Sequence, residues 1–246
     1  MSVLRAAFRL AYFLGFALAF IAWVRVRFWA RGKDMRWALH FRQRWVHRYL
    51  LPPLGIHLRV EGKIPDEPCL FVGNHRSYID PALVSTQVAG YPLAKAEIAN
   101  WPLIGQGVRL TGVLLVRRED KSSRKDALAE IAAKICEGYS IILFPEGTTH
   151  ADAQTREFRP GAFKVATELG LPIVPMAIDY HTSRAYWLND DTFLAHFLRC
   201  FGEPVIRSAL HFGPPIRTTR PQEAIAAARS WIDAQLHSIR QNFSQN

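Results

Sequence analysis

A histidine and an aspartate, His75 and Asp80, stand five residues apart in the stretch "GNHRSYIDP" (73–81). Five residues of α-helix turn through about 500°, and an odd spacing on a strand points side chains to opposite faces, so neither regular element brings them together. A strand that ends at Asn74, a turn, and a helix that begins at Pro81 would do so. Asp80 would then hold one tautomer of His75, which would act as a general base.

Each residue also has a purely structural interpretation. Asp80 before Pro81 is a favourable N-cap and N1 pair, and His75 is typical of a loop histidine bonded to backbone. The functional interpretation requires an alcohol substrate to supply the nucleophile, because the sequence contains no G-x-S-x-G nucleophile motif.

A second polar cluster, "FPEGTT" (144–149), follows another apolar run. Glu146 and Thr148 have side chains that can contact a polar substrate, and Gly147 allows close approach of the backbone. Downstream, Arg159 lies just before a helix predicted to begin near Gly161, whose free N–H groups would suit an anion. An ordinary turn is the alternative for these residues.

The elements that must position these clusters form an alternating pattern after residue 55. Short apolar runs, expected as strands, lie at 69–74, 112–118, 140–147 and 171–178, and helix-like segments lie at 81–89, 123–137, 162–169 and 221–240. This alternation predicts an α/β fold with a largely parallel central sheet flanked by helices. In such folds the site lies where several strands end.

The excess positive charge lies at the N-terminus. Residues 1–60 contain eleven Lys and Arg residues and one acidic residue, which accounts for the whole net charge of +10. The uncharged run 10–24 would make roughly 22 Å of helix, short of the roughly 30 Å hydrocarbon core. It would nearly span a membrane if extended to residue 6, provided that Arg9 snorkels to the headgroups.

The N-terminal segment is therefore predicted to associate with membrane lipids, either across the bilayer or within one leaflet. A cleaved signal peptide is the alternative, but no small-residue cleavage site follows. Residues 35–50 are typical of an interfacial amphipathic helix or of one packed on the protein's own core. Pro52 and Pro53 mark a boundary, which predicts a membrane-associated basic segment (1–52) and a catalytic domain (53–246). The basic, aromatic-rich segment favours a membrane over nucleic acid, and no nucleic-acid partner is predicted.

Metal and disulfide chemistry have little support in the sequence. The three cysteines are far apart and odd in number, which indicates a reducing compartment, and the nine histidines show no metal-ligand spacing.

Taken in order, four motifs resemble those of the PlsC-like glycerolipid acyltransferases, the 1-acylglycerol-3-phosphate acyltransferase family. They are N-H-x-x-x-x-D at 74–80, "TGVLLVRR" at 111–118, "FPEGTT" at 144–149 and "LPIVPMAI" at 171–178. The resemblance covers about residues 55–215 and implies the glycerol-3-phosphate acyltransferase-like fold.

The resemblance implies acyl transfer from acyl-CoA or acyl carrier protein to the free hydroxyl of a lysophospholipid, with no cofactor or metal. 1-Acyl-sn-glycerol-3-phosphate is the expected acceptor. His75 would deprotonate its hydroxyl, and Asp80 would orient His75. The expected substrate-binding residues are Lys95, Arg117, Arg118, Glu146, Gly147, Thr148 and Arg159. The expected location is the inner (cytoplasmic) membrane, with the active site on the cytoplasmic side.

Two departures from the family pattern leave the acceptor headgroup open. Thr149 stands where many phosphatidate-forming members have arginine, and Arg117 stands where aspartate is common. "FPEGTT" is more similar to relatives that acylate other lysolipids, such as lyso-ornithine lipid or lysophosphatidylcholine. A non-enzymatic lipid-binding membrane protein of the same fold is the alternative from another class.

Overall fold

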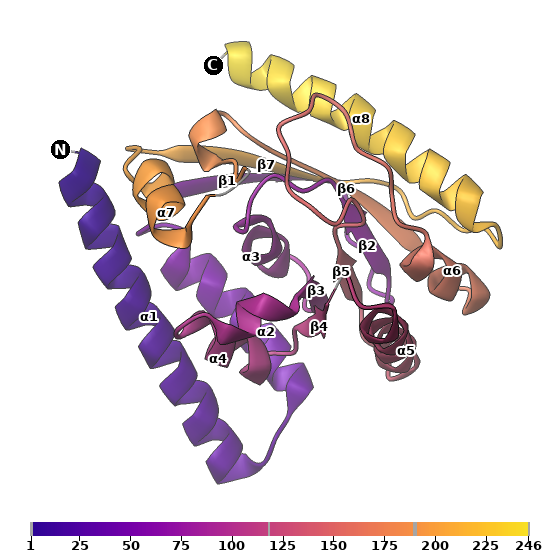
Figure 1. The fold of residues 1–246 in the computed structure, drawn as a ribbon, viewed down its shortest axis with the longest axis horizontal. Helices are drawn as coiled ribbons and strands as arrows, with labels where there is room; N and C mark the ends of the chain where they lie inside the picture. The colour runs from indigo at the N-terminus through magenta and orange to yellow at the C-terminus, as the bar shows by residue number, and fades with distance from the viewer. Residues whose placement is uncertain (1, 118, 189–190, 246) are drawn as a thin grey trace.

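The central feature of the fold is one mixed β-sheet (Figure 1). The computed structural model describes residues 2–117, 119–188 and 191–245. In this part of the chain, seven strands pair in the order β1-β7-β6-β2-β5-β3-β4. The strands are β1 (Ile56–Glu61), β2 (Leu70–Gly73), β3 (Tyr91–Lys95), β4 (Leu114–Val116), β5 (Ile141–Leu143), β6 (Ile173–Tyr180) and β7 (Ile206–Phe212).

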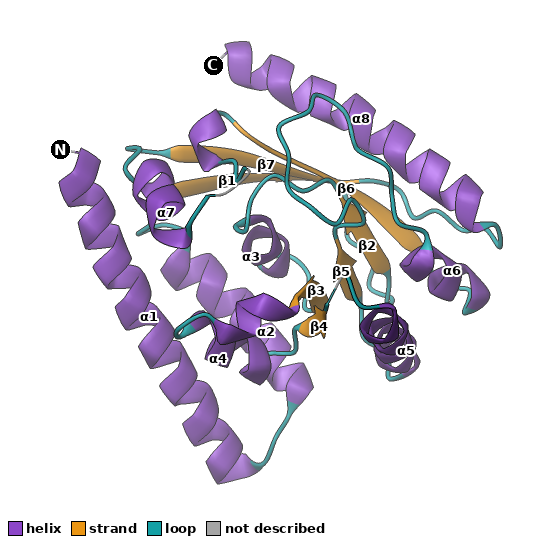
Figure 2. Cartoon of the chain, viewed as in Figure 1, coloured by secondary structure: helices purple, strands orange, loops and turns teal. Residues whose placement is uncertain are grey.

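Helices cover both faces of this sheet, as Figure 2 shows. The helices are α1 (Ser2–Arg31), α2 (Met35–Trp45), α3 (Asp80–Ser85), α4 (Ile104–Leu110), α5 (Lys121–Cys136), α6 (Gly161–Glu168), α7 (Phe193–Phe201) and α8 (Pro221–Gln245). A π-helical turn, Val46–Leu50, continues α2. Helices α5, α6 and α8 lie on one face, and α3 and α7 lie on the other, with α1 outside α7.

The α/β prediction with a largely parallel sheet is confirmed. All four strands expected from apolar runs are present, and β2, β3, β4, β5 and β6 run parallel. Strand β7 is antiparallel to β6 and pairs in parallel with β1, so these two strands reverse direction at one side. Strands β1, β3 and β7 were not predicted, and the helix expected at 81–89 ends earlier, at Ser85.

The parallel arrangement places the carboxyl ends of β2, β5, β3 and β4 at one edge of the sheet. His75 follows β2, Glu146 follows β5, Lys95 ends β3 and Arg117 follows β4. Because parallel strands end at the same edge, four segments that carry predicted site residues lie along it.

Helix α1 packs along the rest of the chain and is bonded to it near its start. Arg9 is 7% exposed, and its guanidinium donates to the carbonyl oxygens of Phe201 (3.0 Å), Glu203 (2.5 Å) and Pro204 (2.9 Å). Gly55, at φ +74°, leaves room for this group, since a Cβ there would lie 2.0 Å from Arg9 Nη2. The condition for a span that begins at residue 6, that Arg9 snorkels to lipid headgroups, is therefore not met in this structure. Its guanidinium is instead hydrogen-bonded to carbonyl oxygens at the end of α7 and in the loop that leads to β7.

Helix α2 packs on the protein's own core, which was one of the two alternatives for residues 35–50. Leu39 lies in a buried cluster together with Leu70 and Tyr91. The buried guanidinium of Arg42 donates to Thr111 O (2.6 Å) and Gly90 O (2.5 Å), and burial lowers the pKa of Arg42 to about 10. These contacts join the N-terminal segment to the loops around β3 and β4.

We expect Arg9→Ala to lower the stability of the protein. The substitution leaves three backbone carbonyls without their donor, at about 1–3 kcal/mol for a buried unsatisfied group. At about 2–4 °C per kcal/mol for a chain of this size, thermal unfolding in detergent should show a clear drop in the melting temperature. Arg31→Ala is the matched control, because Arg31 is exposed at the other end of α1. Equal melting temperatures for the two variants would contradict the role given to Arg9.

Candidate active site

His75 and Asp80 meet in the loop that joins β2 to α3. His75 Nδ1 lies 2.8 Å from Asp80 Oδ2, and the His75 side chain is 14% exposed whereas that of Asp80 is fully buried. Asp80 is not the N-cap of α3, because that position belongs to Ile79. Its carboxylate instead accepts from the backbone N–H groups of Arg76 (2.6 Å) and Ser77 (2.9 Å), which closes the turn around His75.

The second carboxylate oxygen of Asp80 accepts from Tyr180, at the end of β6. Tyr180 Oη lies 2.5 Å from Asp80 Oδ1. Burial, and then the negative charge of Asp80, raises the pKa of Tyr180 well above its usual value, so the hydroxyl remains a donor. Four donors thus surround Asp80. Because the carboxylate only accepts, His75 Nδ1 carries the hydrogen, and the lone pair of its Nε2 can take a proton from a substrate.

Two further contacts fix His75: the backbone before it is bonded to β6, and its ring stacks on the residue that follows β5. The Asn74 side chain donates to Ile178 O (2.8 Å) and accepts from Ile178 N (2.9 Å), which ties the end of β2 to β6. The imidazole of His75 stacks on Phe144, with ring centroids 4.4 Å apart and planes at 18°. One imidazole nitrogen is therefore fixed on a carboxylate, in a ring held against a second aromatic ring. This arrangement suits general-base catalysis.

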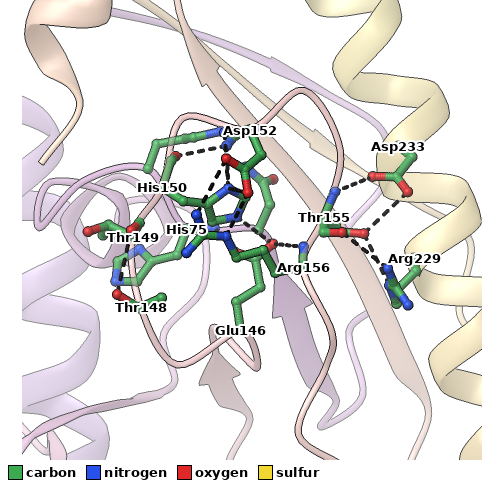
Figure 3. Close-up of polar contacts among 12 residues, drawn as sticks. His75, Glu146, Thr148, Thr149, His150, Asp152, Thr155, Arg156, Arg229 and Asp233 are labelled. Carbon is green, nitrogen blue, oxygen red and sulfur yellow. Dashed lines mark hydrogen bonds and ion pairs between the residues drawn. The ribbon is translucent and has the colours of Figure 1, made fainter. Parts of the chain in front are cut away.

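Glu146 lies beside His75, but its carboxylate points into the protein (Figure 3). Its Oε2 accepts from His75 N (2.8 Å) and its Oε1 accepts from Arg156 N (3.0 Å). His150 Nε2 lies 2.9 Å from Oε1, and both side chains are almost completely buried. Glu146 thus connects the backbone of the predicted base, His75, with that of Arg156, further along the loop that follows β5.

Gly147 and Arg159 lie together, whereas Thr148 is exposed at the surface of the same loop. Gly147 has φ +76°, and a Cβ there would lie 2.9 Å from Arg159 Nε. Both residues line a cavity of about 470 Å³ at the carboxyl ends of β3, β4 and β5. The cavity reaches Phe144, whose ring stacks on His75, and the start of α6 at Gly161.

We expect Gly147→Ala to lower activity as well as stability. An alanine at positive φ costs about 1–2 kcal/mol, and its Cβ would displace Arg159 from the cavity. Gly170→Ala is the matched control, because Gly170 has φ +66° and a Cβ there would meet no atom within 4 Å. Both variants should lose melting temperature, and only Gly147→Ala should lose acyl transfer. Full activity of Gly147→Ala would show that this close approach does not matter.

Lys95 and Arg117 are both exposed at the sheet edge that carries His75. Lys95 ends β3, and Arg117 follows β4, with its backbone N–H donating to Ser123 Oγ at 2.9 Å. Arg118 lies outside the described residues. The roles predicted for these cations, and for the residues of the second cluster, stay predictions. Lys95 and Arg117 share the feature that they lie at the carboxyl ends of neighbouring parallel strands.

A second, apolar cavity of about 230 Å³ lies between the α1, α4 and α7 helices and the loop 78–82. Its lining includes Phe13, Phe16 and Phe20 of α1, with Tyr78 and Ile79, which directly precede Asp80. An apolar cavity next to the loop that carries the predicted base suits a hydrocarbon chain.

Three residues of the site were not predicted from the sequence: Arg76, His150 and Tyr180. Tyr180 lies two residues beyond "LPIVPMAI", and only the length of β6 brings it to Asp80. Arg76 and His150 are fully or nearly fully buried polar residues within or next to the motifs. Among the described residues, no group of three or more His, Cys, Asp or Glu side chains could hold a metal ion.

Comparison with known protein sequences identifies one family. The Acyltransferase family matches residues 56–179. The lyso-ornithine lipid O-acyltransferase of Pseudomonas aeruginosa is 32% identical over 81% of this chain and 80% of its own length. The 1-acyl-sn-glycerol-3-phosphate acyltransferase of Haemophilus influenzae is 30% identical over 54% of this chain and 58% of its own length.

The fold is also similar to that of a solved structure. The crystal structure of the 1-acyl-sn-glycerophosphate acyltransferase PlsC from Thermotoga maritima superposes with a TM-score of 0.72 and 21% identity, covering 98% of both chains. The sequence comparisons, which span the His75–Asp80 loop and the Glu146 loop, show that this chain is an acyltransferase enzyme of the Acyltransferase family.

Proposed function

We propose that this chain transfers a fatty acyl group from a thioester donor to the free hydroxyl of a lysolipid. The observation that carries the proposal is the fixed His75–Asp80 pair, at a sheet edge with no protein nucleophile required. His75 Nε2 takes the proton of the acceptor hydroxyl, and the oxygen attacks the thioester carbonyl. The thiolate of acyl-CoA or acyl carrier protein then leaves, and the proton on His75 neutralises it. A base in this position accelerates such a step by about 10²- to 10⁴-fold.

The two cavities fit the two ends of a lipid. The apolar cavity beside Tyr78 and Ile79 suits an acyl chain, because its exposed lining is almost wholly apolar. The anionic headgroup then belongs at the sheet edge, where Lys95, Arg117 and Arg159 follow three different strands. Cations there would pair with a phosphate or a carboxylate.

Two acceptors remain candidates, each with its own support. The lyso-ornithine lipid O-acyltransferase of Pseudomonas aeruginosa is similar over most of this chain, and Thr149 stands in place of an expected arginine. 1-Acyl-sn-glycerol-3-phosphate is supported by the cations at the sheet edge and by the relatives that act on it. The reaction at the hydroxyl is the same for both.

We further propose that the enzyme lies on the inner membrane with α1 in one leaflet. By length and composition α1 could cross a bilayer, with a mean hydropathy of 1.8 over 18 residues. However, Arg9 near its start and Arg25 near its end both contact the same domain, Arg25 through Gln106 of α4 at 2.9 Å. A helix bound to one domain at both ends lies along the membrane surface. Its exposed apolar residues include Leu4, Phe8, Leu18, Trp23, Val26 and Trp29.

The test is an acyl-transfer assay of the purified full chain in vesicles. Labelled acyl-CoA and acyl carrier protein are each offered with 1-acyl-sn-glycerol-3-phosphate or lyso-ornithine lipid, and labelled diacyl product is measured. Product from one acceptor assigns the headgroup, and the donor series assigns the thioester. If no pair gives product, the lipid-binding alternative replaces the proposed reaction.

A further inference from the structure

Strand β6 continues past the end of β2 and carries a tyrosine to the loop between β2 and α3. Gly73, the last residue of β2, pairs with Met176, and β6 then runs on to Tyr180. The Tyr180 side chain is buried in the same apolar cluster as Ile79, so packing fixes the direction of its hydroxyl. Tyr180 Oη donates to Asp80 Oδ1 at 2.5 Å.

The two carboxylate oxygens of Asp80 have different partners. Oδ2 accepts from His75 Nδ1 at 2.8 Å and from the N–H groups of Arg76 and Ser77, whereas Oδ1, among the described residues, accepts only from Tyr180. Because a carboxylate shares its charge between both oxygens, a donor at Oδ1 reduces the negative charge that His75 meets at Oδ2. A negative charge beside an imidazole stabilises its protonated form. The Tyr180 hydroxyl therefore favours the neutral ring, which is the form that can act as a base.

We propose that Tyr180 is a positioning residue of the acyl-transfer reaction: its hydroxyl holds the Asp80 carboxylate and keeps His75 unprotonated down to a lower pH than Asp80 alone would allow. This inference rests on the proposed function for its kinetic consequence, but not for its effect on the charge of His75. The competing interpretation is that Tyr180 only satisfies a buried carboxylate and contributes to stability alone.

Other ionisable side chains lie around these three residues, but in the described part of the chain none of them bonds to the His75 ring or to the Asp80 carboxylate. They are Arg76 in the same loop, Glu146 and His150 after β5, Asp179 on β6 and Cys200 on α7. The Asp179 carboxylate is paired with Arg240 of α8 at 2.7 Å. Burial raises the pKa of the Cys200 thiol to about 12, so this group stays uncharged near neutral pH.

Tyr180→Phe removes the hydroxyl, and Tyr186→Phe is the matched control. Tyr186 Oη donates to a different buried carboxylate, Asp179 Oδ1, at 2.6 Å, and the two tyrosine rings lie 6.4 Å apart. Both variants should lose melting temperature. Only Tyr180→Phe should move the acid limb of the pH profile of kcat/KM, by about 0.5–1 pH unit to higher pH, because this limb reports protonation of the base in the free enzyme. An unmoved limb in Tyr180→Phe, or equal movement in both variants, would overturn the proposal.

A titration without substrate separates this inference from the proposed function. In full-length protein labelled with 15N-histidine, the imidazole resonances of His75, assigned with His75→Ala, report the pH at which half of the rings are protonated. This midpoint should rise in Tyr180→Phe and stay in place in Tyr186→Phe. If the wild type acylates no lysolipid but the midpoint rises, the proposed function fails and the effect of Tyr180 on His75 stands. If product forms and the midpoint does not move, the inference alone fails.

A tyrosine analogue covers the case in which Tyr180→Phe does not fold. Incorporation of 3-fluorotyrosine at position 180 keeps the hydroxyl and makes it a stronger donor, because the fluorine makes the phenol more acidic. It should move the His75 midpoint to lower pH, opposite to the effect of phenylalanine, and an unmoved midpoint would overturn the proposal. In Asp80→Asn, where no carboxylate remains, the analogue should move the midpoint much less. An equal movement in that background would contradict a role through Asp80.

Discussion

Acyl transfer by His75→Ala is expected to fall by about 10²- to 10⁴-fold or to below detection, because the variant has no base within reach of the acceptor hydroxyl. Product formation from saturating donor and acceptor gives kcat directly. The melting temperature should change little, since the ring is partly exposed and its main contacts are Asp80 and Phe144.

His57→Ala is the matched control for this result. His57 is an exposed histidine on β1, at the opposite end of the strand order from β4. It should keep wild-type kcat. A folded His75→Ala protein that still forms product at the wild-type rate would show that another group deprotonates the acceptor.

Asp80→Asn is expected to give the second largest loss, at least about 10²-fold in kcat, at the lower end of the range for losing general-base function. Three N–H donors converge on Oδ2, so the amide oxygen must occupy that place and the amide NH2 must face Tyr180. The hydrogen therefore remains on His75 Nδ1. The variant loses the negative charge that stabilises the imidazolium formed during the reaction.

The kinetic pattern separates this effect from weaker substrate binding. Asp80→Asn should lower kcat and kcat/KM equally, because the lost negative charge matters only when His75 becomes charged. Asp66→Asn, an exposed aspartate before β2, is the control for the chemical change. An unchanged kcat in folded Asp80→Asn would remove Asp80 from the mechanism.

Three of the four strands that the sequence predicted lie in the interior of the sheet, and the fourth, β4, is an edge strand. Strands β2, β5 and β6 are buried on both faces and appear as continuous apolar runs. Strand β1 was missed because its pattern includes exposed Arg59, and β3 was missed because Pro92 and Lys95 interrupt its apolar run. Strand β7 carries His211 and Arg207 and follows a helix that the spacing did not separate from it.

At the site, contacts set by the local chain could be predicted from the sequence, whereas contacts between loops from different strands could not. The proximity of His75 and Asp80 followed from local chain geometry, because only a turn between a strand and a helix could bring them together. The bonds from Glu146 and His150 to the His75 backbone could not be predicted, since they depend on how two loops from different strands cross in space. Glu146 as an acceptor ligand stays a prediction, although its carboxylate faces inward in the structure.

The position of α1 has a consequence for the kinetics of the enzyme. This helix supplies the apolar outer face and also one wall of the cavity beside the catalytic loop. With α1 in one leaflet, as proposed above, a lysolipid would move sideways from the leaflet into the site without exposing its chain to water, at about 0.8 kcal/mol for each methylene kept covered. The reaction rate should therefore depend on the mole fraction of lysolipid in the membrane rather than on its bulk concentration, so that dilution with inert lipid slows the enzyme at constant total acceptor.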